Sequence, residues 1–172
     1  MSIHDRSLYL KYAEALSYPR DFSSNVASFF TQDAEINIVH PFNQLIGVDS
    51  YLKEFLLPLQ HSFEGLYRRD DIFMAGEFKG QNWISSTGYY VGQFARDWIG
   101  LSATKTLRYL RYGEFHRIHN NQVVESYIYL DIPELMIACN QWPLDIGPGH
   151  SRGYTGLIQG PASRDGVLIG AA

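Results

Sequence analysis

The sequence predicts an α+β domain in which helices come first and a long antiparallel sheet follows. Two observations predict this fold class. Apolar residues recur at helical spacing in the first third of the chain, whereas from Leu66 onward they fall in long β-like runs separated by short turns. Consecutive strands joined by short turns form an antiparallel meander. We therefore expect a cone-shaped α+β barrel, with N-terminal helices packed on a strongly curved antiparallel sheet.

Three helical segments precede the sheet. The first covers 5–18 and ends at Pro19, and the second covers about 22–31. The third covers 49–63, and because Pro58 lies inside it we expect a kinked or split helix. A short strand, 35–40, precedes this third helix, and Pro41 stops it.

Four long strands and a last helix complete the predicted domain. The strands are expected at 66–79, 82–98, 103–118 and 122–130, and the helix at 132–140. The remaining residues are rich in glycine and proline and lack a clear period. We therefore place one domain over 1–140 and a C-terminal extension over 141–172.

Composition narrows the class of protein. The chain has 172 residues, 45% of them hydrophobic and 19% charged, which is typical of one folded domain. The net charge of −4 argues against a nucleic-acid partner. The single cysteine, Cys139, indicates a reducing compartment, so we expect a cytoplasmic protein. We expect no membrane span, because no apolar run approaches ~18 residues. We expect no signal peptide, because MSIHDRSLYL lacks a basic segment followed by an apolar run.

The stretch 109–131 carries the candidate functional residues. Asn120-Asn121 suits a two-residue hairpin turn. Without a bulge, this turn places His116 opposite Glu125 and Glu114 opposite Tyr127. One face of the hairpin then carries Tyr112, Glu114, His116, Glu125, Tyr127, Tyr129 and Asp131. Carboxylates and a histidine among tyrosines are typical of a cavity wall, so we expect this face to line a pocket.

The opposite face of the hairpin is expected to meet a second copy of the chain. Phe115, Ile128 and Leu130 share its parity. Because exposed apolar strands are usually covered, we expect a homodimer through the outer face of the sheet.

Asp131 has two possible roles. Asp131-x-x-Glu134 before an apolar helical run is a capping box, with Pro133 near the helix start. A carboxyl buried among tyrosines would instead have a raised pKa, which suits a general acid/base. The residues alone leave both roles open.

The histidines also have alternative roles. His116 could orient or protonate a substrate oxygen with Glu125 as its partner, or it could be a structural cross-strand residue. His40 ends a strand and could be a packing residue. Metal binding is not expected, because no cysteine or histidine cluster has zinc spacing.

Four segments together resemble one known family. In chain order they are DAEINIVHP, LIGVDSYLKEFLLPL, SSTGYYVGQF and RIHNNQVVESYIYLDIPELM. Their order and spacing over 8–140 resemble the SnoaL-like polyketide cyclases of the nuclear-transport-factor-2-like superfamily.

The resemblance implies an intramolecular aldol ring closure without metal or cofactor, or related isomerase or hydratase chemistry. It implies that Asp131 is the acid/base, assisted by His116, and that His40 points into the pocket. We expect an apolar, oxygenated substrate held by His40, Tyr90, Tyr112, Glu114, Tyr127 and Tyr129. Two alternatives remain: a non-catalytic binder of a small apolar ligand, and a dimerising interaction module.

Overall fold

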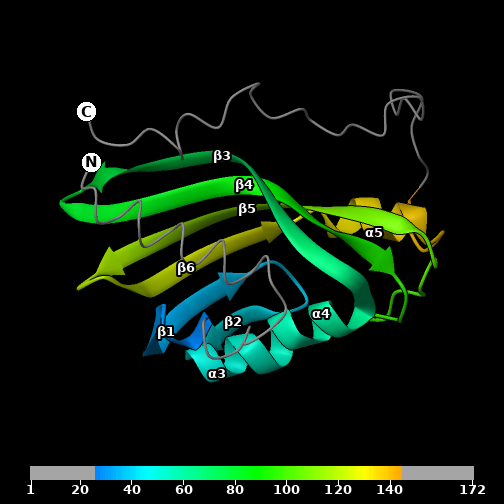
Figure 1. Cartoon of the computed structure of the whole chain (residues 1–172), viewed down its shortest axis with the longest axis horizontal. Coiled ribbons are helices and arrows are strands. Elements are labelled where there is room, and N and C mark those ends of the chain that lie inside the picture. Colours follow the sequence, from blue (N-terminus) through cyan, green and yellow to red (C-terminus); the bar gives the residue numbers. More distant parts are fainter. Residues whose placement is uncertain (1–25, 145–172) are drawn as a thin grey trace.

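The structure is a computed structural model, and it describes residues 26–144. The expected helix at 5–18 and nearly all of the expected C-terminal extension lie outside these residues. The predicted fold class is confirmed: a helical segment packs on one face of a curved, mostly antiparallel sheet of six strands (Figure 1). The domain boundary at residue 140 stays a prediction.

The sheet has the strand order β2-β1-β6-β5-β4-β3. Its strands are β1 (Phe30–Ile38), β2 (Asn43–Ile46), β3 (Phe63–Phe78), β4 (Gln81–Phe94), β5 (Leu107–His119) and β6 (Gln122–Leu130). From β3 to β6 each strand pairs antiparallel with the next along the chain. β1 pairs parallel with β6, and β2 pairs antiparallel with β1. The long strands bend over the helical segment in Figure 1.

The helical segment runs continuously from residue 48 to residue 62, in three parts. They are α3 (Val48–Ser50), a π-helical part η1 (Tyr51–Leu56) and α4 (Leu57–Ser62). A kink or split was expected at Pro58, but the helix is unbroken there: its π-helical part ends at Leu56, and Pro58 lies in the first turn of α4, where the missing amide is tolerated. Tyr51, Phe55 and Leu59 recur every four residues and are fully buried. This apolar stripe joins the segment to the core between helix and sheet.

The first strand begins earlier than the sequence indicated. Within the expected helix at 22–31, only Val26 and Ala27 of the described residues are helical, and β1 starts at Phe30. The turn expected after Pro41 contains the short strand β2. Both differences arise because pairing with β6 and β1, which is non-local, overrides local periodicity.

The loop between β4 and β5 is longer than expected. β4 ends at Phe94, and β5 begins only at Leu107. The backbone amides of Ala95 and Arg96 donate to the carbonyl of Ser62, so this part of the chain bonds to the end of the helical segment. The last helix is confirmed as α5 (Ile132–Ala138).

The hairpin of β5 and β6 differs from the prediction by one residue. Asn120 and Asn121 both have positive φ, as the predicted turn requires. Ile118 pairs with Val123 as expected, but Arg117 pairs with Glu125, so Val124 is an extra residue that forms a bulge. The predicted pairs of His116 with Glu125 and of Glu114 with Tyr127 are therefore wrong.

The bulge exchanges the two faces of β6. His116 pairs with Ser126, Glu114 with Ile128 and Tyr112 with Leu130. Ser126, Ile128 and Leu130 are consequently buried on the inner, helix-facing side of the sheet. Tyr127 and Tyr129 are exposed on the outer side.

Candidate functional site

A cluster of buried polar side chains lies on the inner face of the sheet. β3 contributes Arg68 and Asp70, β4 contributes Ser86 and Tyr90, β5 contributes Tyr112, Glu114 and His116, and β6 contributes Ser126. Every member is at most 5% exposed. Charged side chains are rarely buried unless they are paired, so such a cluster is a candidate functional site.

Arg68 joins the two carboxylates of the cluster. Its guanidinium donates to both oxygens of Glu114, with Nη1 at 3.1 Å from Oε2 and Nη2 in a shorter contact with Oε1. Its Nε donates to Oδ1 of Asp70 at 2.9 Å. The planar fork of arginine matches this geometry, because its N–H groups lie in one plane.

Two tyrosines and a serine surround this ion-pair network. The hydroxyl of Tyr112 donates to Oδ1 of Asp70 in a short contact, and the hydroxyl of Ser86 donates to the same oxygen at 3.1 Å. The Arg68 guanidinium lies 4.2 Å from the ring centre of Tyr112. The ring centres of Tyr90 and Tyr112 are 5.1 Å apart. Apolar ring surface thus lies directly beside acid and hydroxyl groups.

His116 lies between Glu114 and Ser126. Its Nε2 is 3.3 Å from Oε1 of Glu114, and its Nδ1 is 2.7 Å from Oγ of Ser126. An ionised carboxylate can only accept hydrogen bonds, so the tautomer with its proton on Nε2 presents that N–H to Glu114. In the neutral imidazole, Nδ1 then accepts from the Ser126 hydroxyl.

The environment shifts the pKa values of Glu114 and Tyr90. Burial raises the pKa of the Glu114 carboxyl, but the charge of Arg68 and the interaction with His116 outweigh burial, and its pKa lies below the ordinary 4.5. Burial raises the pKa of Tyr90 far above its usual range, because the phenolate would lose its hydration. Glu114 is therefore held as the anion and Tyr90 as the neutral phenol.

Sequence reasoning missed half of this cluster. The run Arg68-Arg69-Asp70-Asp71 looks like a solvated stretch, yet Arg68 and Asp70 are buried. The available signal was strand alternation, which puts Arg68 and Asp70 on one face and Arg69 on the other. Tyr90, Tyr112, Glu114 and His116 were expected in the site, and the structure brings them together there.

Glu125, Tyr127 and Tyr129 do not belong to this cluster. Glu125 accepts from Nε of Arg117 at 2.6 Å and from the hydroxyl of Tyr127 at 2.7 Å, on the outer face. The Tyr127 hydrogen bond, followed by Arg117, lowers the pKa of Glu125 despite partial burial. Glu125 therefore does not orient His116, which corrects the expectation from the sequence.

Asp131 caps α5. Its Oδ1 accepts from the backbone amide of Glu134 at 3.2 Å, and proline lies in the first turn, as the capping box predicts. Asp131 also lines a cleft of about 390 Å³ with Arg111, Gly113 and Tyr129 among its walls. His40 is exposed in the turn that follows β1 and so does not point into an interior pocket.

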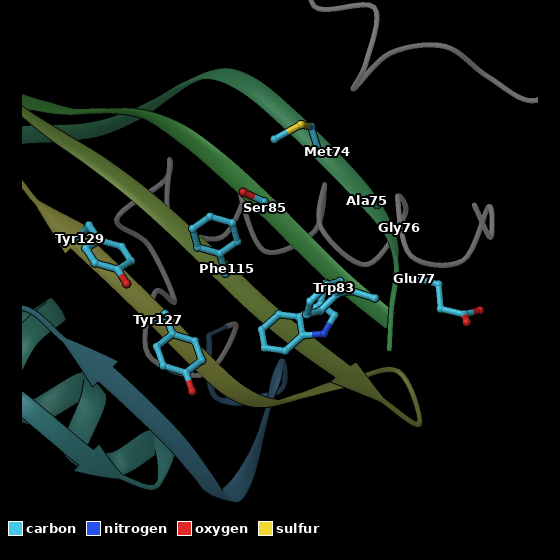
Figure 2. A pocket seen from close by; sticks show the side chains of 10 residues that line it. Met74, Ala75, Gly76, Glu77, Trp83, Ser85, Phe115, Tyr127 and Tyr129 are labelled. Carbon is cyan, nitrogen blue, oxygen red and sulfur yellow. The ribbon is translucent and has the colours of Figure 1, made fainter. Parts of the chain in front are cut away.

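A larger groove lies on the outer face of the sheet, away from the buried cluster. Its volume is about 610 Å³. Figure 2 shows the rings of Trp83, Phe115, Tyr127 and Tyr129 on its walls. Its walls are apolar, with no clustered titratable groups, so we assign the candidate chemistry to the inner-face cluster rather than to this groove.

Residues 26–144 contain no group of three or more histidine, cysteine, aspartate or glutamate side chains placed to hold a metal ion. No helix in that same range is long and apolar enough to cross a membrane.

The fold resembles those of several solved structures, although neither a family model nor a curated protein matches the sequence. AclR from Streptomyces galilaeus, named provisionally as a hydroxylase, is 17% identical with a TM-score of 0.69; the match covers 86% of this chain and 87% of AclR. A provisionally named SnoaL-like polyketide cyclase from Jannaschia sp. CCS1 is 13% identical with a TM-score of 0.68, covering 82% of this chain and 94% of that one.

A third likeness is a hypothetical protein with a ketosteroid isomerase-like fold from Catenulispora acidiphila, crystallised in complex with trimethylamine. It is 11% identical with a TM-score of 0.56, and the match covers 77% of this chain and 92% of that one. Other matching structures are named polyketide cyclases or NTF2-like proteins. The chain therefore has the α+β barrel fold shared by the SnoaL-like polyketide cyclases and the NTF2-like proteins.

Proposed function

We propose that the protein is a cofactor-independent enzyme that performs acid/base chemistry on a small, apolar, oxygenated molecule, as a polyketide cyclase does. One observation carries the proposal: two carboxylates, an arginine and a histidine are buried together among tyrosines on the inner face of the sheet. Solved structures of the same fold that are named as polyketide cyclases support the choice of reaction.

The proposed reaction is an intramolecular aldol closure or a related proton transfer. A base removes a proton from a carbon beside a carbonyl, and that carbon attacks a second carbonyl of the same molecule. The resulting alkoxide takes the proton back, so a C–H bond and the π bond of the second carbonyl are exchanged for a C–C bond and an O–H bond. Asp70 and His116 are the proposed proton carriers. Arg68 and the hydroxyl of Tyr112 are the proposed donors to the oxygen that becomes negative.

Asp131 is a second candidate for the acid/base. The resemblance assigns it that role, and its cap uses one oxygen, Oδ1, which leaves the other for substrate. Asp131→Asn keeps a capping side chain, so it separates this role from the structural one.

The test uses a panel of linear β-dicarbonyl esters as candidate substrates. Mass spectrometry measures the rate at which a carbon-bound proton of each ester is exchanged for deuterium. Asp70→Asn and His116→Gln are expected to slow exchange ~10²–10⁴-fold. Asp71→Asn is the matched control, since Asp71 is the next residue and pairs with Arg69 at 2.9 Å. Equal rates in Asp70→Asn and Asp71→Asn, with both variants folded, would contradict the assignment.

A non-catalytic binder is the alternative, and one observation favours it. The carboxylates of Asp70 and Glu114 and both His116 nitrogens already have partners within the protein. A cluster whose polar groups all bond to one another can have a purely structural role, in which it holds neighbouring strands together and performs no chemistry. Saturable ligand binding without any deuterium exchange in the wild type would select this alternative.

We also propose a homodimer through the outer face of the sheet, although the residues that support it differ from those that the sequence indicated. Of the three residues from which the sequence predicted it, Ile128 and Leu130 are buried in the core, and only Phe115 is exposed. The bulge in β6 places Tyr127 and Tyr129 beside Phe115 instead. Light scattering that reports a monomer at micromolar concentration would contradict the homodimer.

A further inference from the structure

Strand β6 presents a single polar side chain to the core. Its buried residues are Val123, Ser126, Ile128 and Leu130, and of these only Ser126 is polar. Ser126 is completely buried, and a buried hydroxyl is destabilising unless it forms a hydrogen bond. The reason for a serine at this position therefore lies in the contact that its hydroxyl makes.

The hydroxyl of Ser126 meets the imidazole of His116 across the strand pair. The bulge at Val124 brings the two residues opposite each other, with Oγ of Ser126 2.7 Å from Nδ1 of His116. Both residues are at most 1% exposed. Within residues 26–144 the structure shows no second hydrogen bond of the Ser126 hydroxyl, so nothing in that range competes with His116 for it.

Other elements hold the rest of the imidazole. Nε2 lies 3.3 Å from Oε1 of Glu114, on the same strand. The ring of Phe30, on β1, lies edge-on to it, with the ring centres 6.1 Å apart and the planes at 86°. Ile84 of β4 is its cross-strand neighbour. The two ring nitrogens therefore have different partners: Nδ1 faces a hydroxyl, and Nε2 faces a carboxylate.

A residue that carries a proton needs partners that suit each of its protonation states. The neutral imidazole has one N–H group and one acceptor nitrogen, whereas the imidazolium has two N–H groups. A carboxylate only accepts hydrogen bonds, but a hydroxyl both donates and accepts. The Ser126 hydroxyl donates to Nδ1 when the proton is on Nε2, and after rotation it accepts from Nδ1–H. Neither state leaves Nδ1 without a partner.

We propose that Ser126 is a positioning residue for His116, and that its hydroxyl holds Nδ1 so that Nε2 is the nitrogen that exchanges a proton with the substrate. The inference rests on the proposed function and names the nitrogen at which His116 acts. The charged ring is the acid: Glu114 stabilises it from the side of Nε2, and Ser126 accepts from its Nδ1–H.

The proton transfer balances without any further reactant. Asp70 takes the carbon-bound proton, and the electron pair of the C–H bond becomes the C=C π bond of the enol. The π pair of the carbonyl takes the proton from Nε2 of His116 and forms an O–H bond. The electron pair of the broken N–H bond stays on Nε2. The neutral ring that results keeps its proton on Nδ1, where Ser126 still accepts it.

Loss of the Ser126 hydroxyl should affect the charged ring more than the neutral one. A hydrogen bond from a charged donor contributes more than one between neutral groups. Because the charged ring is the acid, removing its acceptor depletes the reactive form of the enzyme. The rate constant at saturating substrate should therefore fall, whereas KM should stay nearly unchanged, because a positioning residue does not contact the substrate.

The test compares two pairs of proteins that differ by one hydroxyl, in the deuterium-exchange assay. The pairs are wild type with Ser126→Ala, and Ser126→Thr with Ser126→Val, whose side chains have nearly the same shape. Each loss of the hydroxyl is expected to lower the saturating rate constant ~10–100-fold. Ser126→Thr is expected to stay close to wild type.

Ser62→Ala is the matched control. Ser62 is 2% exposed, and its hydroxyl donates to the carbonyl of Asp97 at 3.1 Å, away from the cluster. This variant also loses a buried hydroxyl, but it should leave the rate constant of exchange unchanged. Melting temperatures above the assay temperature establish that each variant is folded.

Nitrogen-15 NMR of the imidazole checks the contact without turnover. The signal of His116 Nδ1 is expected to move in Ser126→Ala, because the nitrogen loses its hydrogen bond, and to stay near the wild-type position in Ser126→Thr and Ser62→Ala. A signal that Ser126→Ala leaves in place would overturn the inference.

The outcomes separate the role of Ser126 from the proposed enzyme. Exchange that His116→Gln slows but Ser126→Ala does not would overturn the positioning role and leave the proposed function standing. Equal rates in Ser126→Thr and Ser126→Val would overturn the positioning role as well, and so would a raised KM with an unchanged saturating rate. A wild type that exchanges no proton of any ester would overturn the proposed function and this inference with it.

Discussion

At the scale of single residues, the cluster shows how alternation sorts identical residue types into different environments. Arg68 and Asp70 face the helix and are at most 5% exposed, whereas Arg69 and Asp71 form an ion pair that solvent reaches. A buried charge without its partner is strongly destabilising, whereas an exposed pair contributes little. The same two residue types therefore carry very different consequences at neighbouring positions.

Asp131 gives a prediction about capping. Asp131→Ala removes the acceptor for the Glu134 amide and is expected to lower the free energy of unfolding by ~0.5–2 kcal/mol. Asp131→Asn should change it by much less, because asparagine is also a good cap. Urea unfolding of the three proteins measures the difference. Equal stabilities of Asp131→Ala and wild type would show that the cap contributes nothing.

Glu114 gives a prediction about pH. Because its folded-state pKa lies below its ordinary 4.5, the stabilisation from its charge is complete above pH 4.5 and is lost as the pH falls below that value. At neutral pH, Glu114→Gln removes one of the two carboxylates paired with the buried Arg68, and it is expected to lower the free energy of unfolding by ~3–5 kcal/mol. The difference in free energy of unfolding between wild type and Glu114→Gln should decrease as the pH falls below 4.5. Urea unfolding at neutral and acidic pH measures this difference, and a difference independent of pH would contradict the ionised state of Glu114.

At the scale of elements, one extra residue decides which side chains of β6 enter the core. Val124 has no partner on β5, so every residue after it is displaced by one position relative to a regular hairpin. Serine, isoleucine and leucine then point inward at 126, 128 and 130, and the tyrosines point outward. The inward set is apolar apart from Ser126, which has His116 as its partner. The bulge thus places more apolar surface in the core than the regular register would.

Strand β4 passes close to the backbone of β3 at Gly88. A Cβ added there would lie 1.9 Å from the carbonyl oxygen of Arg69 and 2.9 Å from the hydroxyl of Tyr112. Because backbone must move to accommodate it, Gly88→Ala is expected to lower the melting temperature strongly and to disturb the cluster. Gly76→Ala, whose Cβ meets open space, is the matched control and should be neutral or slightly stabilising. A melting temperature that falls equally in both variants would contradict the close approach.

At the scale of the whole molecule, the sheet separates two surfaces with different chemistry. The inner surface holds the buried ion pairs and the core, and the outer surface holds the aromatic groove. A homodimer through the outer surface leaves the inner cluster of each copy intact, so the proposed chemistry and the proposed assembly do not compete for the same residues.

The homodimer makes stability depend on concentration. If folding and dimerisation are coupled, mass action raises the melting temperature of the wild type as protein concentration increases. Phe115→Asp should remove this dependence. Differential scanning calorimetry over a hundredfold range of concentration measures both. A wild-type melting temperature that does not vary with concentration would contradict a coupled dimer.

The sequence by itself determined the fold class, the hairpin turn at Asn120-Asn121 and the cap at Asp131. Each of these depends on local features of the chain: the spacing of apolar residues, the positive φ that asparagine tolerates, and a short side chain that accepts a hydrogen bond from a backbone amide. The inward positions of Glu114 and His116 also followed from parity on a single strand. The reducing compartment indicated by the lone Cys139 stays a prediction.

Only the tertiary structure decided the composition of the site. Arg68 and Asp70 enter it because β3 and β5 face the same core, and Glu125 leaves it because of the bulge at Val124. Alternation along β3 places Arg68 and Asp70 on one face, but which face of the strand meets the core depends on non-local pairing. The bulge at Val124 likewise exchanges the two faces of β6 without a local signal. The free energy that selects this register comes from burying apolar side chains and completing the partners of buried charges across four strands.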